Sequence, residues 1–212
     1  MIKTIILSFF EDCIRNCSGP IGRKFRQWYY RGRLGSCGRN VKIDTGVYFE
    51  NPKEISLGDN VWIDKNCILI AGTLNKKNTR FVNQANSNGS LGKIKIGSNS
   101  HIGIGTVMQG HGGITTGEFF TTSAYCRIYS FSNDYKQIHH GTQDSSEFGE
   151  SHYVVGPVEI GKNVWLGLNV SVISCNLGND SFILPHSVVY HSIDANSVAG
   201  GNPASKQKSR FE

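Results

Sequence analysis

The chain has 212 residues, of which 25 are glycine and 18% are charged, so it can bury a core and is too apolar for a disordered protein. Its net charge of +6 is uneven, because the first 42 residues carry nine basic residues against two acidic ones. A basic end attracts anionic partners, and no nucleic-acid motif follows it. We therefore expect no nucleic-acid partner and favour a lipid surface or a structural role.

The N-terminal segment is predicted to be helical. From residue 2 to 17 apolar residues recur at helical spacing, and a Gly-Pro pair at 19–20 ends the pattern before a second short helix. We predict that residues 1–34 cap the domain that follows, and a compatible alternative places residues 1–33 on the inner face of a membrane. The short apolar start resembles neither a signal peptide nor a membrane span, and the six cysteines form no CxxC pair. The expected location is cytoplasmic, with at most peripheral membrane contact.

A different rhythm begins near Cys37 and defines the main domain. Apolar residues recur in pairs two apart, and the pairs repeat every six residues, as in Val41/Ile43 and Val158/Ile160. A helix would need a spacing near 3.6, whereas a period of six predicts short strands and tight turns, three to a coil. The predicted fold class is all-β, a parallel β-helix solenoid over residues 35–205. Polar excursions interrupt it at about 72–92 and 133–156, and a basic tail follows at 206–212.

Glycine recurs directly after the apolar pairs, at Gly58, Gly97, Gly161 and Gly167. We expect the coil corner to take positive φ at these glycines, where glycine has no steric cost. The Asn and Asp residues that follow tolerate the left-handed region best after glycine.

The C-terminal coils carry a family resemblance. The segments IGKNVWLGLNV, LGNDSFILPHSVV and IDANSVAGGNPA resemble hexapeptide-repeat acetyltransferases, above all sugar and polysaccharide O-acetyltransferases such as the galactoside and maltose enzymes. The resemblance covers about residues 37 to 208. It implies left-handed coils, a homotrimer, acetyl-coenzyme A as cosubstrate, no metal, and transfer to a hydroxyl of a sugar or surface-glycan precursor.

The resemblance also implies the coenzyme contacts. Carried over by position, they are Trp165, Leu168, Pro185, Tyr190, His191, Lys206 and Lys208. The two lysines suit the phosphates of a nucleotide, since lysine is a flexible point charge, although a solvated C-terminal tail explains them equally well. Packing at a subunit seam is an equal alternative for Trp165. The sequence ILPH replaces the usual IGAG beside the expected coenzyme.

The general base is a histidine in this family, and the chain departs from the usual pattern. The galactoside and maltose enzymes place it after a strand reading roughly IYTATH, whereas IYSFSN puts Asn133 there, with Asp134 next. His111 in VMQGHGGITTGE, which also resembles a serine acetyltransferase segment, is the best replacement. The next apolar pair arrives two residues late, so this corner should bulge outward and stack beside Asn133 and Asp134. Asp134 would then orient the imidazole. His139 and His140 are the runners-up, and corner backbone N–H groups would stabilise the oxyanion.

Two other functions fit the same solenoid. A γ-type carbonic anhydrase holds zinc with three histidines across a subunit seam, and His111, His139 and His140 are candidates for such a site. A catalytically inactive scaffold is the second alternative, because the expected histidine after IYSFS is missing.

Overall fold

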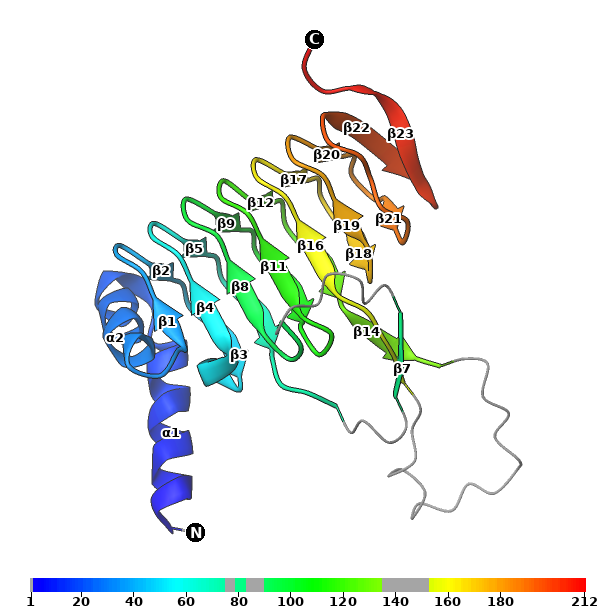
Figure 1. Cartoon of the computed structure of the whole chain (residues 1–212). Helices are drawn as coiled ribbons and strands as arrows, with labels where there is room; N and C mark the ends of the chain where they lie inside the picture. The colour runs from blue at the N-terminus through cyan, green and yellow to red at the C-terminus, as the bar shows by residue number, and fades with distance from the viewer. Residues whose placement is uncertain (1, 75–78, 83–89, 135–152) are drawn as a thin grey trace.

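The six-residue spacing produces coils of three short strands, and the coils stack along one axis from the N-terminal helices to a C-terminal hairpin (Figure 1). The computed structural model describes residues 2–74, 79–82, 90–134 and 153–212, with side chains from Phe9 onward. The predicted fold class, a left-handed parallel β-helix with a short N-terminal helical segment, is confirmed.

Three sheets form the walls of the stack. Sheet A contains β1 (Ser36–Cys37), β4 (Ile55–Leu57), β8 (Ile94–Ile96), β11 (Ile114–Thr116), β16 (Val158–Ile160) and β19 (Asn176–Leu177). Sheet B contains β2 (Lys42–Ile43), β5 (Trp62–Ile63), β9 (His101–Ile102), β12 (Thr121–Thr122), β17 (Trp165–Leu166), β20 (Phe182–Ile183), β22 (Ser197–Gly201) and β23 (Ala204–Ser209). Sheet C contains β3 (Tyr48–Glu50), β6 (Ile68–Ile70), β10 (Val107–Gln109), β13 (Arg127–Tyr129), β18 (Ser171–Ile173) and β21 (Val188–Val189).

The apolar pairs of the hexads fill the interior of the coils. In sheet C, Leu69, Met108 and Ile128 lie in register in consecutive coils, and all three are fully buried. In sheet B, Ile63 and Ile102 stack in the same way. Each coil buries its side chains against the coils on either side, so the hydrophobic free energy of the fold is shared between nearest neighbours.

The corners correct one expectation from the sequence. The left-handed backbone falls on asparagine, with φ of 57° at Asn60 and 59° at Asn99, and not on the preceding Gly58 and Gly97. The expectation of positive φ is wrong for all four glycines, at positions 58, 97, 161 and 167. These positions need glycine because neighbouring coils stack closely there. A Cβ would lie 2.6 Å from a backbone nitrogen at Gly58 and 2.2 Å from a backbone oxygen at Gly97.

Two helices, α1 (Ile2–Asn16) and α2 (Gly19–Arg31), lie at the N-terminal end of the stack, and α2 contacts the first coil. The side chain of Arg26 is buried between them. Its Nε donates to the Ile43 carbonyl at 2.9 Å, and its Nη1 donates to the Ile14 carbonyl at 3.1 Å and to the Cys17 carbonyl. One guanidinium thus supplies donors to carbonyls that the end of α1 leaves without intrahelical partners. Neither helix has the length and apolar character of a bilayer-crossing segment, among the residues the structure describes.

We predict that Arg26→Met loosens both helices. Methionine fills much of the space but leaves buried carbonyls without a donor, at about 1–3 kcal/mol each. We expect amide hydrogen exchange in α1 and α2 to accelerate by roughly 100-fold, which corresponds to about 3 kcal/mol. Arg31→Met, at an exposed position of the same helix, should leave exchange unchanged. Equal exchange in the two variants would contradict this role for Arg26.

The excursions predicted at 72–92 and 133–156 fall between β6 and β8 and between β13 and β16, so both depart from the corner that joins sheet C to sheet A. Their described parts pair with each other as sheet D. Its strands are β7 (Thr79–Phe81), β14 (Phe131–Asn133) and β15 (Tyr153–Val155), with β15 parallel to β7 and antiparallel to β14. A 3₁₀ turn, η1 (Pro52–Glu54), marks the same corner one coil earlier.

The C-terminus differs from the predicted tail. Strand β23 pairs antiparallel with β22 and extends sheet B, with Ala199 opposite Lys206 and Val198 opposite Lys208. Both lysines are exposed, but they lie on a hydrogen-bonded strand and not on a free tail. The backbone hydrogen bonds of the hairpin hold them at defined positions beside the last coil.

Candidate active site at the corner of the excursions

His111 lies in the two-residue bulge between β10 and β11, at the corner from which both excursions depart. Its Nδ1 is 2.8 Å from the Gly72 carbonyl, at the start of the first excursion. Its ring packs edge-on against Phe131, at the start of β14, with 4.7 Å between ring centroids. The half-buried imidazole is therefore held between the roots of the two excursions.

The Gly72 contact determines the useful tautomer of His111. A carbonyl oxygen only accepts hydrogen bonds, so the ring nitrogen bonded to it carries the proton. In the neutral ring Nε2 is then unprotonated and can accept a proton. A carbonyl here does what a carboxylate does in a histidine–acid pair, because it fixes both the tautomer and the ring orientation.

The glycines around His111 allow the bulge to fit. Gly113 has φ of 95°, and Gly112 donates its N–H to the Ser130 hydroxyl at 2.9 Å. A Cβ on Gly112 would lie 2.4 Å from the Ser130 carbonyl oxygen, so only glycine fits there. The N–H of Gly110 donates to the Ile70 carbonyl at 2.8 Å. The Gly110 and Gly112 N–H groups are thus already engaged in hydrogen bonds, and an oxyanion needs other donors.

Sheet D brings the predicted Asn133 and Asp134 to the same corner. Asn133 is two residues after Phe131 in β14, so its side chain lies on the same face of sheet D as the ring that contacts His111. Asp134 accepts a hydrogen bond from Arg80 Nε at 3.1 Å, which links the two excursions. The partner of His111 Nδ1 is the Gly72 carbonyl, so the orienting role expected of Asp134 falls to a backbone group. His139 and His140 lie outside the described residues.

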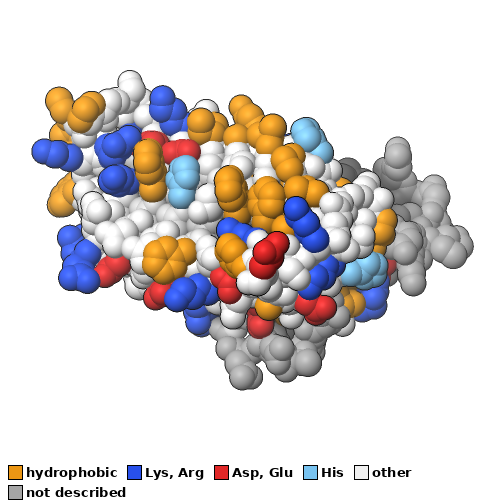
Figure 2. Space-filling view, turned by 90° about the horizontal axis from the view of Figure 1, so that it is seen from above, with side chains coloured by type: hydrophobic (Ala, Val, Ile, Leu, Met, Phe, Trp, Pro, Cys, Tyr) orange, Lys and Arg blue, Asp and Glu red, His pale blue; other side chains and the backbone are white. Residues whose placement is uncertain are grey.

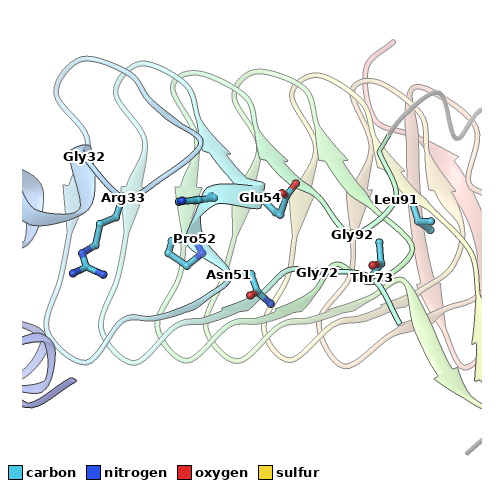
Figure 3. A pocket seen from close by; sticks show the side chains of 10 residues that line it. Gly32, Arg33, Asn51, Pro52, Glu54, Gly72, Thr73, Leu91 and Gly92 are labelled. Carbon is cyan, nitrogen blue, oxygen red and sulfur yellow. The ribbon is translucent and has the colours of Figure 1, made fainter. Parts of the chain in front are cut away.

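A cavity of about 690 Å³ opens along the same corner, toward the N-terminal coils (Figure 3). It is lined by Gly32, Arg33, Asn51, Pro52, Lys53, Glu54, Gly72, Thr73, Leu91 and Gly92. Two of these residues are hydrogen-bonded to His111, Gly72 through its carbonyl and Gly92 through its N–H. Arg33, Lys53 and Glu54 are the charged residues of the lining, and Arg33 Nη1 also lies 3.9 Å from a Glu11 carboxylate oxygen. The volume is in the range of small-molecule sites.

The seven predicted coenzyme contacts lie on two sides of the solenoid. Trp165 is on sheet B, with its Nε1 3.3 Å from the Ser123 hydroxyl. Leu168 and Pro185 follow in the corner from sheet B to sheet C, in adjacent coils, and the two lysines of β23 extend the same sheet. The rings of Tyr190 and His191 lie against each other at a tilt, with centroids 4.5 Å apart, in the segment that follows β21 of sheet C.

The sequence did not reveal a second hydrogen-bonded histidine, which is paired with an aspartate. His101 Nε2 lies 3.0 Å from an Asp64 carboxylate oxygen, and its ring packs near Trp62 with centroids 5.1 Å apart. The signal was present in the repeat, because Trp62 and His101 occupy equivalent positions in neighbouring coils. His101 lies on sheet B, away from the cavity-lining residues.

The buried thiols are poor nucleophiles. Burial raises the pKa of Cys67 to about 12, and it raises the pKa of Cys126 and of Cys175 to about 11. All three therefore stay protonated near neutral pH, and they pack as small apolar side chains. Within the described ranges, no three His, Cys, Asp or Glu side chains converge as metal ligands.

Comparisons with known proteins agree with this architecture. No protein-family model matches the chain. An Escherichia coli dTDP-4-amino-4,6-dideoxy-D-glucose acyltransferase is 31% identical over 173 residues, or 80% of this chain and 79% of the relative. A candidate acetyltransferase of Saccharomyces cerevisiae is 27% identical over 89% of this chain and 72% of its own length.

Solved structures of acyltransferases are also similar to this chain. AntD, an N-acyltransferase from Bacillus cereus solved with dTDP and coenzyme A, superposes with a TM-score of 0.69 at 26% identity, covering 88% of this chain and 90% of AntD. A hexapeptide-repeat acetyltransferase from Vibrio cholerae, solved with acetyl-coenzyme A, shares the fold with a TM-score of 0.57 at 19% identity, covering 94% of this chain and 82% of that protein.

Fold and relatives together define an acyltransferase of the β-helix class. The chain belongs to the hexapeptide-repeat sugar acyltransferase family. The resemblance seen in the C-terminal coils is thereby confirmed.

Proposed function

We propose that the chain transfers an acetyl group from acetyl-coenzyme A to a sugar hydroxyl, with His111 as general base. The observation that carries the proposal is the Gly72 carbonyl bonded to His111 Nδ1, which leaves Nε2 to accept a proton. Gly72 and Gly92, which both bond to His111, line a ligand-sized cavity. The hydroxyl oxygen attacks the thioester carbonyl carbon while Nε2 takes the hydroxyl proton. The carbon–sulfur bond then breaks, and the imidazolium returns the proton to the leaving thiolate.

The residues on sheet B and in the corner that follows it suit coenzyme A. Trp165, Leu168 and Pro185 offer apolar surface for a pantetheine arm, and Lys206 and Lys208 offer positive charge for phosphates. AntD was solved with coenzyme A bound. These residues would hold the donor, which supplies an acetyl group as a reactive thioester.

The acceptor that we propose is a nucleotide-linked sugar. Arg33 and Lys53 line the cavity and can pair with a diphosphate, while Asn51 and Glu54 can hydrogen-bond sugar hydroxyls. The Escherichia coli relative is named for a dTDP-sugar, and AntD was solved with dTDP. We place this reaction in the cytoplasm, where thiols such as those of this chain stay reduced.

A second candidate is transfer to a sugar amine. Both the Escherichia coli relative and AntD are named for chemistry on an amino sugar or an amine. The same base would serve, because an ammonium group must also lose a proton before it attacks a thioester. The two candidates differ in the bond that forms, an ester or an amide.

The chemical stability of the product separates the two candidates. The protein is incubated with radiolabelled acetyl-coenzyme A and either dTDP-glucose or dTDP-4-amino-4,6-dideoxyglucose, and the product is treated with alkaline hydroxylamine. An ester loses its label and an amide keeps it. We expect label that hydroxylamine releases. A stable product formed only from the amino sugar would replace the hydroxyl proposal with the amine.

We also propose that the working unit is a homotrimer. A corner stripe of exposed apolar residues runs along three consecutive coils, formed by Ile104, Tyr125 and Leu168, and the first two are 42% and 55% exposed. Contiguous apolar surface of this kind marks contact sites. Covering it with a second copy would also bring sheet B of one subunit near another subunit, as the divided coenzyme contacts require.

A further inference from the structure

The outward face of α2 is unusually apolar for a surface helix. Ile21, Phe25 and Trp28 follow one another at spacings of four and three residues, and their side chains are 68%, 52% and 70% exposed. We call these three residues the aromatic ridge. Residues at such spacings share one side of a helix, so the ridge is continuous.

The inward face of α2 is already packed without the ridge. Arg26, Tyr29 and Tyr30 are buried there, with Arg26 bonded to backbone carbonyls and both tyrosine hydroxyls bonded to Glu11. The usual arrangement has apolar residues inward and charged residues outward, and α2 partly reverses it. The core therefore does not explain the ridge.

Exposed positive charge lies beside the aromatic ridge. Lys24 and Arg31 are exposed on the same side of α2, and Phe9 of α1 adds another exposed ring at this end. The first 42 residues carry nine basic against two acidic residues. Figure 2 shows hydrophobic and basic side chains interleaved at the end of the molecule that carries the helices.

We propose that the aromatic ridge docks on an anionic phospholipid bilayer. Apolar side chains enter the boundary between headgroups and acyl chains, while Lys24 and Arg31 pair with lipid phosphates. Tryptophan suits this depth because its ring is apolar and its N–H is polar. The proposal goes beyond the acyltransferase activity and does not depend on it.

Charge decides between a bilayer and a second copy of the chain. Two such ends would bring together surfaces of the same sign, which repel. An anionic bilayer offers the complementary sign over an area large enough for both helices. Self-association through the ridge is therefore an outcome that counts against the proposal.

The test is co-sedimentation of the full chain with vesicles. Vesicles of phosphatidylcholine with phosphatidylglycerol are compared with vesicles of phosphatidylcholine alone, at low and high salt. We expect binding to the anionic vesicles only, weakened by salt. The double variant F25S/W28S should bind on the order of tenfold more weakly, and so should K24S/R31S.

Phe211→Ser is the matched control, because Phe211 is a half-exposed aromatic residue at the opposite end of the chain. It should bind vesicles like the wild type. The replaced side chains are exposed, so circular dichroism should show all variants folded. The proposal is overturned if the wild type stays in the supernatant, if F25S/W28S binds as tightly as the wild type, or if F25S/W28S changes the oligomeric mass. Turnover with a soluble sugar should be equal in wild type and F25S/W28S, which keeps this test separate from the proposed reaction.

Discussion

Replacing His111 by alanine is expected to lower kcat by about 10²–10⁴-fold, the usual contribution of a positioned general base. The loss follows from the role of Nε2, which takes the acceptor proton as the thioester is attacked. Thiol release from acetyl-coenzyme A measures it, at saturating acceptor. A rise in KM with kcat unchanged would mean that His111 only binds substrate.

Two variants show whether that loss is chemical or structural. In His111→Asn the side-chain amide can still donate to the Gly72 carbonyl from near the place of Nδ1, but it cannot act as a base. We expect this variant to be folded and as inactive as His111→Ala. His101→Ala removes the His101–Asp64 hydrogen bond on sheet B and should keep activity within a few-fold of the wild type. Full activity in His111→Asn, or a larger loss of activity in His101→Ala than in His111→Ala, would show that His111 is not the general base.

Ile104→Glu is expected to dissociate the proposed trimer. A carboxylate placed in the corner stripe would be buried without a partner at the subunit seam, at a cost on the order of 3 kcal/mol per subunit. Sedimentation should give three times the chain mass of 23.4 kDa for the wild type and the chain mass for the variant. Coenzyme A binding should fall together with the mass, because its predicted contacts are divided between two sides of each chain.

Lys65→Glu controls for the added negative charge. Lys65 occupies the same corner one coil earlier and is exposed, and its carbonyl accepts the N–H of Gly105. It lies outside the apolar stripe, so this variant should keep the mass of the wild type. A wild type that sediments as a monomer, or an Ile104→Glu trimer, would exclude this seam.

The six-residue period was sufficient to predict stacked coils of three strands, because every apolar pair it marks faces the same interior. The left-handedness of the coils came from the family resemblance. The period did not reveal why the corners need glycine. Gly58 and Gly97 are required by contact with the next coil, and a contact between residues about twenty or forty positions apart leaves no local signal. The asparagines that carry the positive φ were visible in the sequence.

The candidate site was predictable only in part. The late apolar pair indicated a bulge at His111, and the bulge lies beside the second excursion, in contact with Phe131. The Gly72 partner could not be predicted, since any residue offers a carbonyl and 39 positions separate the two. The pairing of β7 with β15 in sheet D could not be predicted either, because these two strands lie outside the six-residue repeat. The Asp64–His101 pair could have been found by aligning the coils in register.

Thiol release from acetyl-coenzyme A, measured with and without nucleotide-linked sugars, tests the central claim most directly. The account predicts release that requires a sugar and matches the acetylated sugar one for one. Thiol release at the same rate without any sugar, or none across hydroxyl and amino sugars alike, would contradict it.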